Sequence, residues 1–307
     1  MPFSQVPHTI LMVRPASFGY NPETAASNAF QKKSTDGEMV QSAALQQFDA
    51  AVDKIRAKGI AVTVVEDTPE PKTTDAIFPN NWITTHEDGK IILYPMMAPS
   101  RRKERRSDIV QQLKDNYVVS GVYDLSKSEL EEKFLEGTGS IIFDHPNKIA
   151  YACRSKRTEK ELFVSLCDQL GYKPILFSAV DENGQAIYHT NVMMWVGESV
   201  AGICLDSIHD EDEEELILSQ LASTNHKIIA LSHAQINAFA GNMFEVKNGN
   251  DDRFLLMSQA AYDSLLPGQR VEIEKYLNPL PIDIHTIEES GGGSIRCMVA
   301  GIHLPLK

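Results

Sequence analysis

The feature that most limits the fold of this chain is a pattern of predicted elements that recurs along its length. Several times, two short apolar runs joined by a polar turn are followed by a helical pattern and then by a single apolar run. The interval is roughly 50–60 residues, and such recurrence indicates modules that are stacked or arranged radially. Because the units share little sequence identity, the repeat is one of structure. The predicted hairpins span residues 75–97, 134–153, 192–204 and 242–258.

Periodicity within the units gives the order of elements. Between residues 38 and 58, Leu45, Phe48, Val52 and Ile55 follow a helical spacing, and Gly59 is a typical residue to end the helix. Residues 60–65 form a β-branched strand. The same order returns with a helix over 159–170 and a strand over 173–179, and a last strand is expected over 297–302. The fold class is therefore α/β, built from ββαβ-like modules.

Other segments give less regular signals. The basic cluster at 101–106 is expected to be a solvated helix face. The polar segment 16–37 is expected to be either a lid or a fixed surface loop. No Pro/Gly/Ser-rich linker or break in composition divides the chain, so residues 1–307 are expected to form one domain.

Charge and cysteine usage exclude several classes of protein. The net charge of −13 argues against binding to nucleic acid or to an anionic membrane. No apolar run approaches the roughly 20 residues of a membrane span, and the first residues lack the pattern of a signal peptide. The four cysteines are widely spaced, which suits a reducing compartment. We therefore expect a cytoplasmic protein.

A glycine-rich stretch near the end of the chain is the first candidate for chemistry. Gly291, Gly292 and Gly293 allow unusual backbone angles and close approach to a ligand. Cys297 follows, directly after Arg296, and nearby positive charge favours a reactive thiolate. The stretch indicates a tight loop that presents a nucleophile. The alternative is a turn followed by a strand with an ordinary buried cysteine.

Three further polar clusters occupy equivalent places, at the mouths of the predicted hairpins. Each has an ordinary alternative: the asparagines as turn residues, the glutamate as a cap and the histidine as a half-buried surface residue. If the modules surround an axis, however, these clusters and the glycine-rich stretch converge on one cavity. The clusters are Asn80-Asn81, Glu136-Gly137 and His189-Thr190-Asn191.

The order of these motifs resembles that of the guanidine-modifying, or pentein, superfamily, which includes arginine deiminase, dimethylarginine dimethylaminohydrolase, succinylarginine dihydrolase and glycine amidinotransferase. The segments that carry the resemblance cover most of the chain, and 12–15 and 78–82 look most like the bacterial citrulline hydrolase-like branch. They are Phe78-Pro79-Asn80-Asn81, Glu136-Gly137-Thr138-Gly139-Ser140, Ser155-Lys156-Arg157-Thr158, His189-Thr190-Asn191 and Gly291 to Cys297.

The resemblance implies a fold and a chemistry. The fold would be an α/β propeller of five ββαβ modules around a pseudo-fivefold axis. Cys297 would attack the planar carbon of a guanidino or ureido group, and His189 would serve as acid and then base. Glu136 would hold the substrate N–H groups and keep the imidazole charged. The resemblance implies no metal and no organic cofactor.

Departures from the superfamily pattern bear on the substrate. Asn81 and Asn191 stand where arginine-processing members carry aspartates. A guanidinium only donates hydrogen bonds, whereas a neutral ureido group also has a carbonyl oxygen that needs a donor. We therefore expect citrulline or a related compound. Ser140 also replaces the aspartate of the family's Glu-Gly-Gly-Asp motif.

Other residues are expected to bind the substrate. Asn80 and Asp75 are candidates close to Asn81 in sequence, although Asp75 also suits a turn before a strand. An arginine should bind the α-carboxylate, because its planar fork pairs with two carboxylate oxygens. The candidates for this role are Arg14, Arg154 and Arg296.

Alternatives from the same superfamily stay open. An amidinotransferase or an arginine- or dimethylarginine-type deiminase would use the same cysteine, histidine and glutamate. A non-catalytic pentein that serves as a binding module belongs to another class, and the retained Cys297, His189 and Glu136 argue against it. The expected partner is a small amino acid, and a homodimer is a further expectation.

Overall fold

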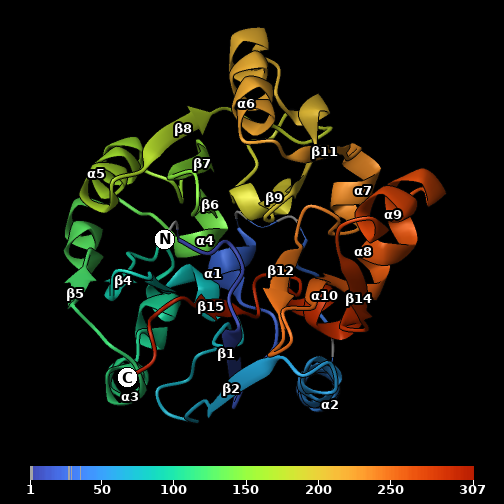
Figure 1. The fold of residues 1–307 in the computed structure, drawn as a ribbon. Helices are drawn as coiled ribbons and strands as arrows, with labels where there is room; N and C mark the ends of the chain where they lie inside the picture. Colours follow the sequence, from blue (N-terminus) through green and yellow to red (C-terminus); the bar gives the residue numbers. More distant parts are fainter. Residues whose placement is uncertain (1–2, 27, 29, 35) are drawn as a thin grey trace.

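Five small sheets surround a central axis, and the helices lie on the outside (Figure 1). The computed structural model describes residues 3–26, 28, 30–34 and 36–307. In each three-stranded sheet the central strand pairs antiparallel with the inner strand and parallel with the outer strand. An antiparallel pair needs only a short turn, whereas the parallel pair needs a helical crossover. The architecture confirms the predicted α/β propeller of five ββαβ modules.

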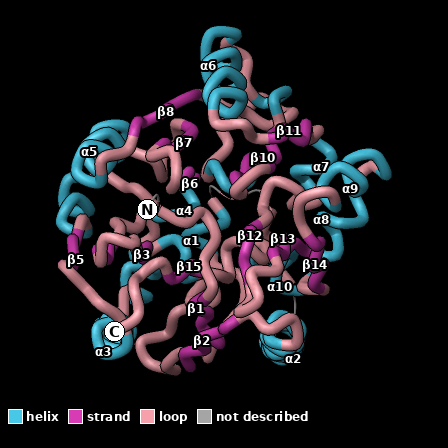
Figure 2. Tube along the Cα trace, viewed as in Figure 1, coloured by secondary structure: helices cyan, strands magenta, loops and turns pink. Residues whose placement is uncertain are grey.

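Strands occupy the inner part of every module, and longer helices mark the five outer corners (Figure 2). In chain order, the strands and α-helices are β1 (Thr9–Arg14), α1 (Pro22–Ala25), α2 (Gly37–Arg56), β2 (Ala61–Glu66), β3 (Ile83–Thr85), β4 (Lys90–Leu93), α3 (Ser107–Asn116), β5 (Gly121–Asp124), α4 (Gly137–Ser140), β6 (Ile142–Asp144), β7 (Ile149–Cys153), α5 (Lys160–Leu170), β8 (Lys173–Phe177), β9 (Met194–Val196), β10 (Val200–Ile203), α6 (Glu211–Ser223), β11 (Lys227–Ala230), α7 (His233–Asn237), β12 (Phe244–Lys247), β13 (Arg253–Ser258), α8 (Gln259–Ser264), α9 (Pro267–Glu274), β14 (Asn278–Ile282), α10 (His285–Gly291) and β15 (Ala300–Ile302).

The two ends of the chain meet in one sheet. Strand β15 pairs antiparallel with β1, in a register that sets Thr9 opposite Ile302 and Leu11 opposite Ala300. Strand β2 pairs with the other edge of β1 in parallel. The last strand of the sequence thus completes the first module and closes the ring. None of the described helices is long and apolar enough to cross a membrane.

Helix α5 shows how local sequence fixes an element. Its buried side chains Phe163, Leu166, Cys167 and Leu170 fall on one face, at the spacing of a helix that packs on a sheet. Gly171 ends the helix in a left-handed conformation (φ 73°), which glycine adopts without strain. The amphipathic pattern seen in the sequence is therefore enough to place this helix between β7 and β8.

Short turns precede the inner strands at the axis. They include 3₁₀ turns over Pro79–Asn81 and Thr190–Val192 and the single turn of α4. Further turns at 239–242 and 294–299 precede β12 and β15. The polar clusters predicted at the hairpin mouths lie on these turns, so the five-module ring brings them to the axis.

Three sequence predictions need correction. The glycine-rich stretch does not begin as a loop, because α10 extends through Gly291 and Gly292 caps it at φ 63°. The final strand begins at Ala300, which leaves Cys297 on the preceding turn. The basic cluster is not a wholly solvated helix face, since Arg101 is 3% exposed. Its carboxylate partner Glu104 allows this burial, and residues 99–104 form a 3₁₀ helix.

Candidate active site

The catalytic residues predicted from the sequence meet at a small pocket near the axis. Cys297 and His189 line the pocket, and Glu136 lies behind the histidine. The pocket is built from the mouth turns of several modules, from α10 and from the segment after α1. Its lining residues are Thr24, Asn28, Gln31, Asp75, Phe78, Asn81, Arg101, Arg157, Tyr188, His189, Gly291, Gly292, Gly293 and Cys297.

Glu136 organises the buried charges of the site. Its Oε2 lies 2.8 Å from His189 Nε2 and 3.3 Å from Arg157 Nη1, and its Oε1 accepts a hydrogen bond from Met97 N at 2.9 Å. The glutamate is fully buried. Burial opposes its ionisation, but Arg157, His189 and Arg101 outweigh burial and hold the pKa of Glu136 well below its usual range. Glu136 is thus a carboxylate that orients the imidazole.

Burial and two nearby guanidinium groups favour the neutral form of His189 in the substrate-free pocket. Burial lowers its pKa to about 4, against the opposing pull of Glu136 and with a further lowering by Arg157 and Arg101. Glu136 favours the charged imidazole, as expected, but in the free site burial and two guanidinium groups oppose it, so this role of Glu136 stays a prediction for the substrate-bound site. A neutral ring accepts a proton first and donates it afterwards.

Two asparagine side chains surround the sulfur of Cys297. Asn242 Nδ2 lies 3.4 Å from Sγ, and Asn191 Nδ2 lies 3.6 Å from it. Asn242 also binds the Arg296 amide through Oδ1 and the Asn191 carbonyl through Nδ2. Both asparagines thus direct an amide N–H group at the sulfur, and Asn242 Oδ1 also lies 3.6 Å from it. Asn242 is therefore a positioning residue for the nucleophile.

Asn81 presents an N–H donor to the site because Arg101 fixes its orientation. Arg101 Nη1 donates to Asn81 Oδ1 at 2.7 Å. A guanidinium has no acceptor, so the amide cannot flip without facing donor against donor. Asn81 Nδ2 is buried and has no hydrogen-bond partner among the described residues. Arg101 is itself held by Glu104 and by the Phe78 carbonyl.

Acceptors occupy other parts of the pocket. Asp75 Oδ2 accepts from Asn21 Nδ2 at 2.8 Å and from Thr24 at 3.2 Å, whereas its buried Oδ1 has no described partner. Gln31 Oε1, in the pocket wall, and Asn191 Oδ1, beside Cys297 but outside the pocket lining, are also buried without a described partner. The pocket therefore offers one fixed donor and several acceptors to a planar polar group.

Part of the polar segment 16–37 covers the glycine-rich end of α10. Asn28 Nδ2 donates to Gly292 O and Gln31 Nε2 donates to Gly291 O, both at 3.0 Å. Tyr188 donates to Gly292 O as well. The described residues of this segment thus form one wall of the pocket.

Glycines allow the catalytic groups to pack closely. Gly137 has φ +46°, and a Cβ there would lie 2.3 Å from the Asn80 carbonyl oxygen. A Cβ on Gly139 would lie 2.4 Å from Asn81 Nδ2 and 2.8 Å from His189 Nδ1. Ser140 supports the same turn, because its hydroxyl accepts from Glu136 N and donates to the Arg157 carbonyl. A short hydroxyl at this position is therefore compatible with the site.

The arginines expected to bind a substrate carboxylate do not line the pocket. Arg14 pairs with Asp49 at 2.7 Å, near the surface, and Arg154 pairs with Glu213 at 2.6 Å. Arg296 lines a different cavity. Arg14 and Arg154 are held outside the pocket by the carboxylates of Asp49 and Glu213, and Arg296 points into another cavity. Asn80 is fully buried but also does not line the pocket, and its carbonyl accepts from Thr138.

Three residues of the site are missing from the expected binding set. Arg101 lies within a basic cluster that resembles a solvated face, and Arg157 lies within the Ser-x-Arg-Thr motif. Asn242 is the first residue of the fourth predicted hairpin. The repeat itself carries the missed signal for Asn242, because five modules require a fifth mouth residue.

Within the described residues, no group of three or more His, Cys, Asp or Glu side chains could hold a metal ion. The groups that the site itself offers are a thiol, an imidazole, carboxylates, amides and guanidinium groups.

Comparisons of the structure find proteins of the same architecture at low identity. The N-terminal domain of ArgZ, an arginine dihydrolase from the ornithine-ammonia cycle in cyanobacteria, matches in a substrate-bound variant with a TM-score of 0.75 and 16% identity, over 97% of this chain and 99% of that one. The apo ArgZ structure matches with a TM-score of 0.69 and 16% identity. This match covers 95% of the present chain but only 39% of the ArgZ chain. A dimethylarginine dimethylaminohydrolase adduct with S-methyl-L-thiocitrulline matches with a TM-score of 0.64 and 14% identity, over 97% and 99% of the two chains.

Sequence comparison gives the family. No match is found among curated proteins. A family model described as N,N dimethylarginine dimethylhydrolase, eukaryotic, matches residues 14–304. The chain therefore belongs to this dimethylarginine dimethylhydrolase family, within the pentein superfamily of C–N hydrolases.

Proposed function

We propose that this protein hydrolyses a C–N bond of the ureido group of citrulline or a closely related amino acid, through a covalent intermediate on Cys297. The observation that carries the proposal is the orientation of Asn81. Arg101 holds its Oδ1 at 2.7 Å, so Nδ2 is the atom left for the substrate. A donor fixed in this way suits a ureido carbonyl oxygen, whereas a guanidinium would set donor against donor.

The remaining polar groups suit the N–H groups of the same substrate. Asp75 Oδ1, Asn191 Oδ1 and Gln31 Oε1 are buried acceptors without described partners. A buried acceptor without a partner is costly, and substrate N–H groups would satisfy it. One carbonyl oxygen and several N–H groups are the hydrogen-bonding set of a ureido group.

The reaction would proceed in two steps. Neutral His189 takes the thiol proton of Cys297 as sulfur attacks the ureido carbon, and the protonated ring then gives a proton to the leaving nitrogen. Water next attacks the thiocarbamate carbon, with His189 as base, and the C–S bond breaks. The carbamic acid released decomposes, so citrulline and one water give ornithine, ammonia and carbon dioxide. Glu136 orients His189 throughout and stabilises its charged form.

The direct test is a substrate panel combined with a single substitution. Intact-protein mass spectrometry after brief exposure to citrulline, arginine, agmatine and methylated arginines should show an adduct on Cys297 with citrulline, and ammonia release should follow. Ammonia from arginine or agmatine but not from citrulline would overturn the proposal. Asn81→Asp replaces the donor by an acceptor, so the ratio of kcat/KM for citrulline to that for arginine should fall at least tenfold. Asn116→Asp changes a solvent-exposed asparagine and serves as the matched control.

A guanidino substrate is the second candidate. The family description names dimethylarginine, and the buried carboxylates Asp75 and Glu136 favour a cationic ligand. Hydrolysis of arginine at its terminal nitrogen yields citrulline and ammonia, so one site can act on the two compounds in succession. Accumulation of citrulline from arginine, followed by its disappearance, would identify this course.

A further inference from the structure

A second cavity lies within the ring of inner strands, separate from the catalytic pocket. All five inner strands, β3, β6, β9, β12 and β15, contribute to its wall. The two cavities share no lining residue. They are nevertheless adjacent, because Arg296 lines one and its neighbour Cys297 lines the other.

Arg296 brings a positive charge into this cavity without a compensating carboxylate. The residue is 8% exposed, and its Nη1 donates to the Val299 carbonyl oxygen at 2.8 Å. Its guanidinium carbon lies 4.1 Å from the centre of the Phe244 ring. Among the described residues, no Asp or Glu lies within ion-pair distance of it. A buried cation without a counter-ion is costly, and stacking on one ring offsets only part of that cost.

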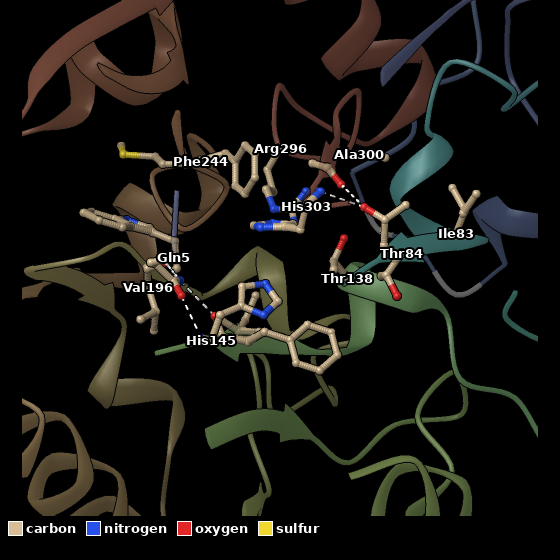
Figure 3. A pocket seen from close by; sticks show the side chains of 16 residues that line it. Gln5, Ile83, Thr84, Thr138, His145, Val196, Phe244, Arg296, Ala300 and His303 are labelled. Atoms are coloured by element: carbon tan, nitrogen blue, oxygen red, sulfur yellow. Dashed lines mark hydrogen bonds between the residues drawn. The ribbon is translucent and has the colours of Figure 1, made fainter. Parts of the chain in front are cut away.

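Histidines add hydrogen-bonding groups beside this charge. Figure 3 shows Arg296 beside His303, with His145 and Thr138 facing the same space. The rings of His145 and His303 lie 4.4 Å apart. His145 Nδ1 bonds to the Tyr172 hydroxyl at 2.7 Å, which leaves its Nε2 for another partner. The ring nitrogens of His303 make no hydrogen bond with the described residues.

The side chains that line the cavity favour a ligand of negative charge. A cation would be repelled by Arg296, and these histidines are not part of any metal-binding group among the described residues. An anion would neutralise the guanidinium and accept hydrogen bonds from imidazole N–H groups. The planar fork of an arginine favours two oxygens on one centre, as in a carboxylate, carbonate or phosphate.

We propose that the cavity enclosed by the five inner strands is a binding site for a small oxyanion, held by Arg296, His303 and His145. Two sources supply this chemistry. Bicarbonate would form from the carbon dioxide that ureido hydrolysis releases in the neighbouring pocket, and inorganic phosphate is free in solution. The proposal does not require the catalytic function, because the unpaired charge is present whatever the pocket does.

The test measures anion binding to the full-length protein. Carbon-13 NMR with labelled bicarbonate and phosphorus-31 NMR with phosphate should each show broadening of the anion signal, and thermal unfolding should shift upward relative to chloride at equal ionic strength. Arg296→Gln should lower the affinity at least tenfold. Arg154→Gln removes a surface arginine of the same charge and should bind like the wild type. Arg296→Lys keeps the charge without the planar fork, and its affinity for the anion should lie between that of the wild type and that of Arg296→Gln.

The outcomes separate the sources and decide the proposal. Binding of bicarbonate alone supports a product site, binding of phosphate alone supports a site for a free anion, and binding of both supports a general oxyanion site. Absence of binding of either anion to the wild type would overturn the proposal. Equal affinity of the wild type and Arg296→Gln, or equal losses in Arg296→Gln and Arg154→Gln, would also overturn it.

Discussion

Gly139 should be the position where one added methyl group disables the site without touching its chemistry. A Cβ on this residue would lie 2.4 Å from Asn81 Nδ2 and 2.8 Å from Cε1 and Nδ1 of His189, whereas ordinary contact begins at 3.4 Å. Neither group can withdraw freely. Arg101 holds Asn81 at 2.7 Å, and Glu136 holds His189 at 2.8 Å, in fully buried surroundings.

The magnitudes follow from these distances. The Asn81 amide must move from 2.4 to at least 3.4 Å, a displacement that breaks its bond to Arg101 or tilts the turn. Misplacing a reacting group by about 1 Å costs roughly 10²-fold in rate. Overpacking a buried site costs about 1–3 kcal/mol of unfolding free energy. Gly139→Ala should therefore lower kcat/KM about 100-fold and lower stability by an amount in that range.

The assay compares ammonia release and urea unfolding for Gly139→Ala with those for Gly268→Ala. The control also adds one methyl group, but a Cβ on Gly268 meets nothing within 4 Å, and the residue lies in helix α9. It should keep wild-type activity and be slightly more stable, because alanine favours a helix. If Gly139→Ala retained kcat/KM within threefold, the close packing of Gly139, Asn81 and His189 would not be the arrangement that supports catalysis.

Three further predictions concern the thiol, its positioning residue and the buried histidines. Cys297→Ser should lower turnover roughly 10⁴-fold or more, with little change in the unfolding midpoint. The control Cys167→Ser, in the buried face of α5, should keep activity and lose about 1–3 kcal/mol of unfolding free energy. The reverse result would assign the nucleophile to Cys167. Asn242→Ala should slow alkylation of Cys297 by iodoacetamide and lower kcat more than it changes KM, because it removes the 3.4 Å contact between Asn242 Nδ2 and Sγ. An unchanged alkylation rate would contradict the role of Asn242 as a positioning residue. Burial lowers the pKa of His86 and His189 to about 4 and that of His303 to about 3, so the unfolded chain binds more protons below its histidine pKa of 6.5. Stability should fall as pH falls from about 6.5 to about 4, by about 1.4 kcal/mol per pH unit for each histidine, and equal urea midpoints at pH 7 and pH 5 would refute this.

The ring architecture could be predicted because its signals are local. Helix α5 and the hairpin of β6 and β7 lie where apolar spacing and turn residues place them, since each element buries one face against its immediate neighbour. The recurrence leaves stacked and radial arrangements open, and the resemblance to the pentein superfamily supplies the ring of five modules. Helix α10 was missed because glycines at its end hide a short helical segment whose Ile287 is buried against α2 and the core.

The sequence by itself determined the repeated modules and the order of Glu136, His189 and Cys297 along them. Only the tertiary structure decided which long side chains reach the site. Arg14 and Arg154 meet surface carboxylates, whereas Arg101 and Arg157 turn inward to Asn81 and Glu136. The physical reason is that backbone periodicity is set by near neighbours, while the partner of a buried charge lies far along the chain, 20 positions away for Arg101 and Asn81 and 21 for Arg157 and Glu136. The pairing of β15 with β1 is also decided only in the tertiary structure. It fixes Arg296 and Cys297 on the turn between the two cavities.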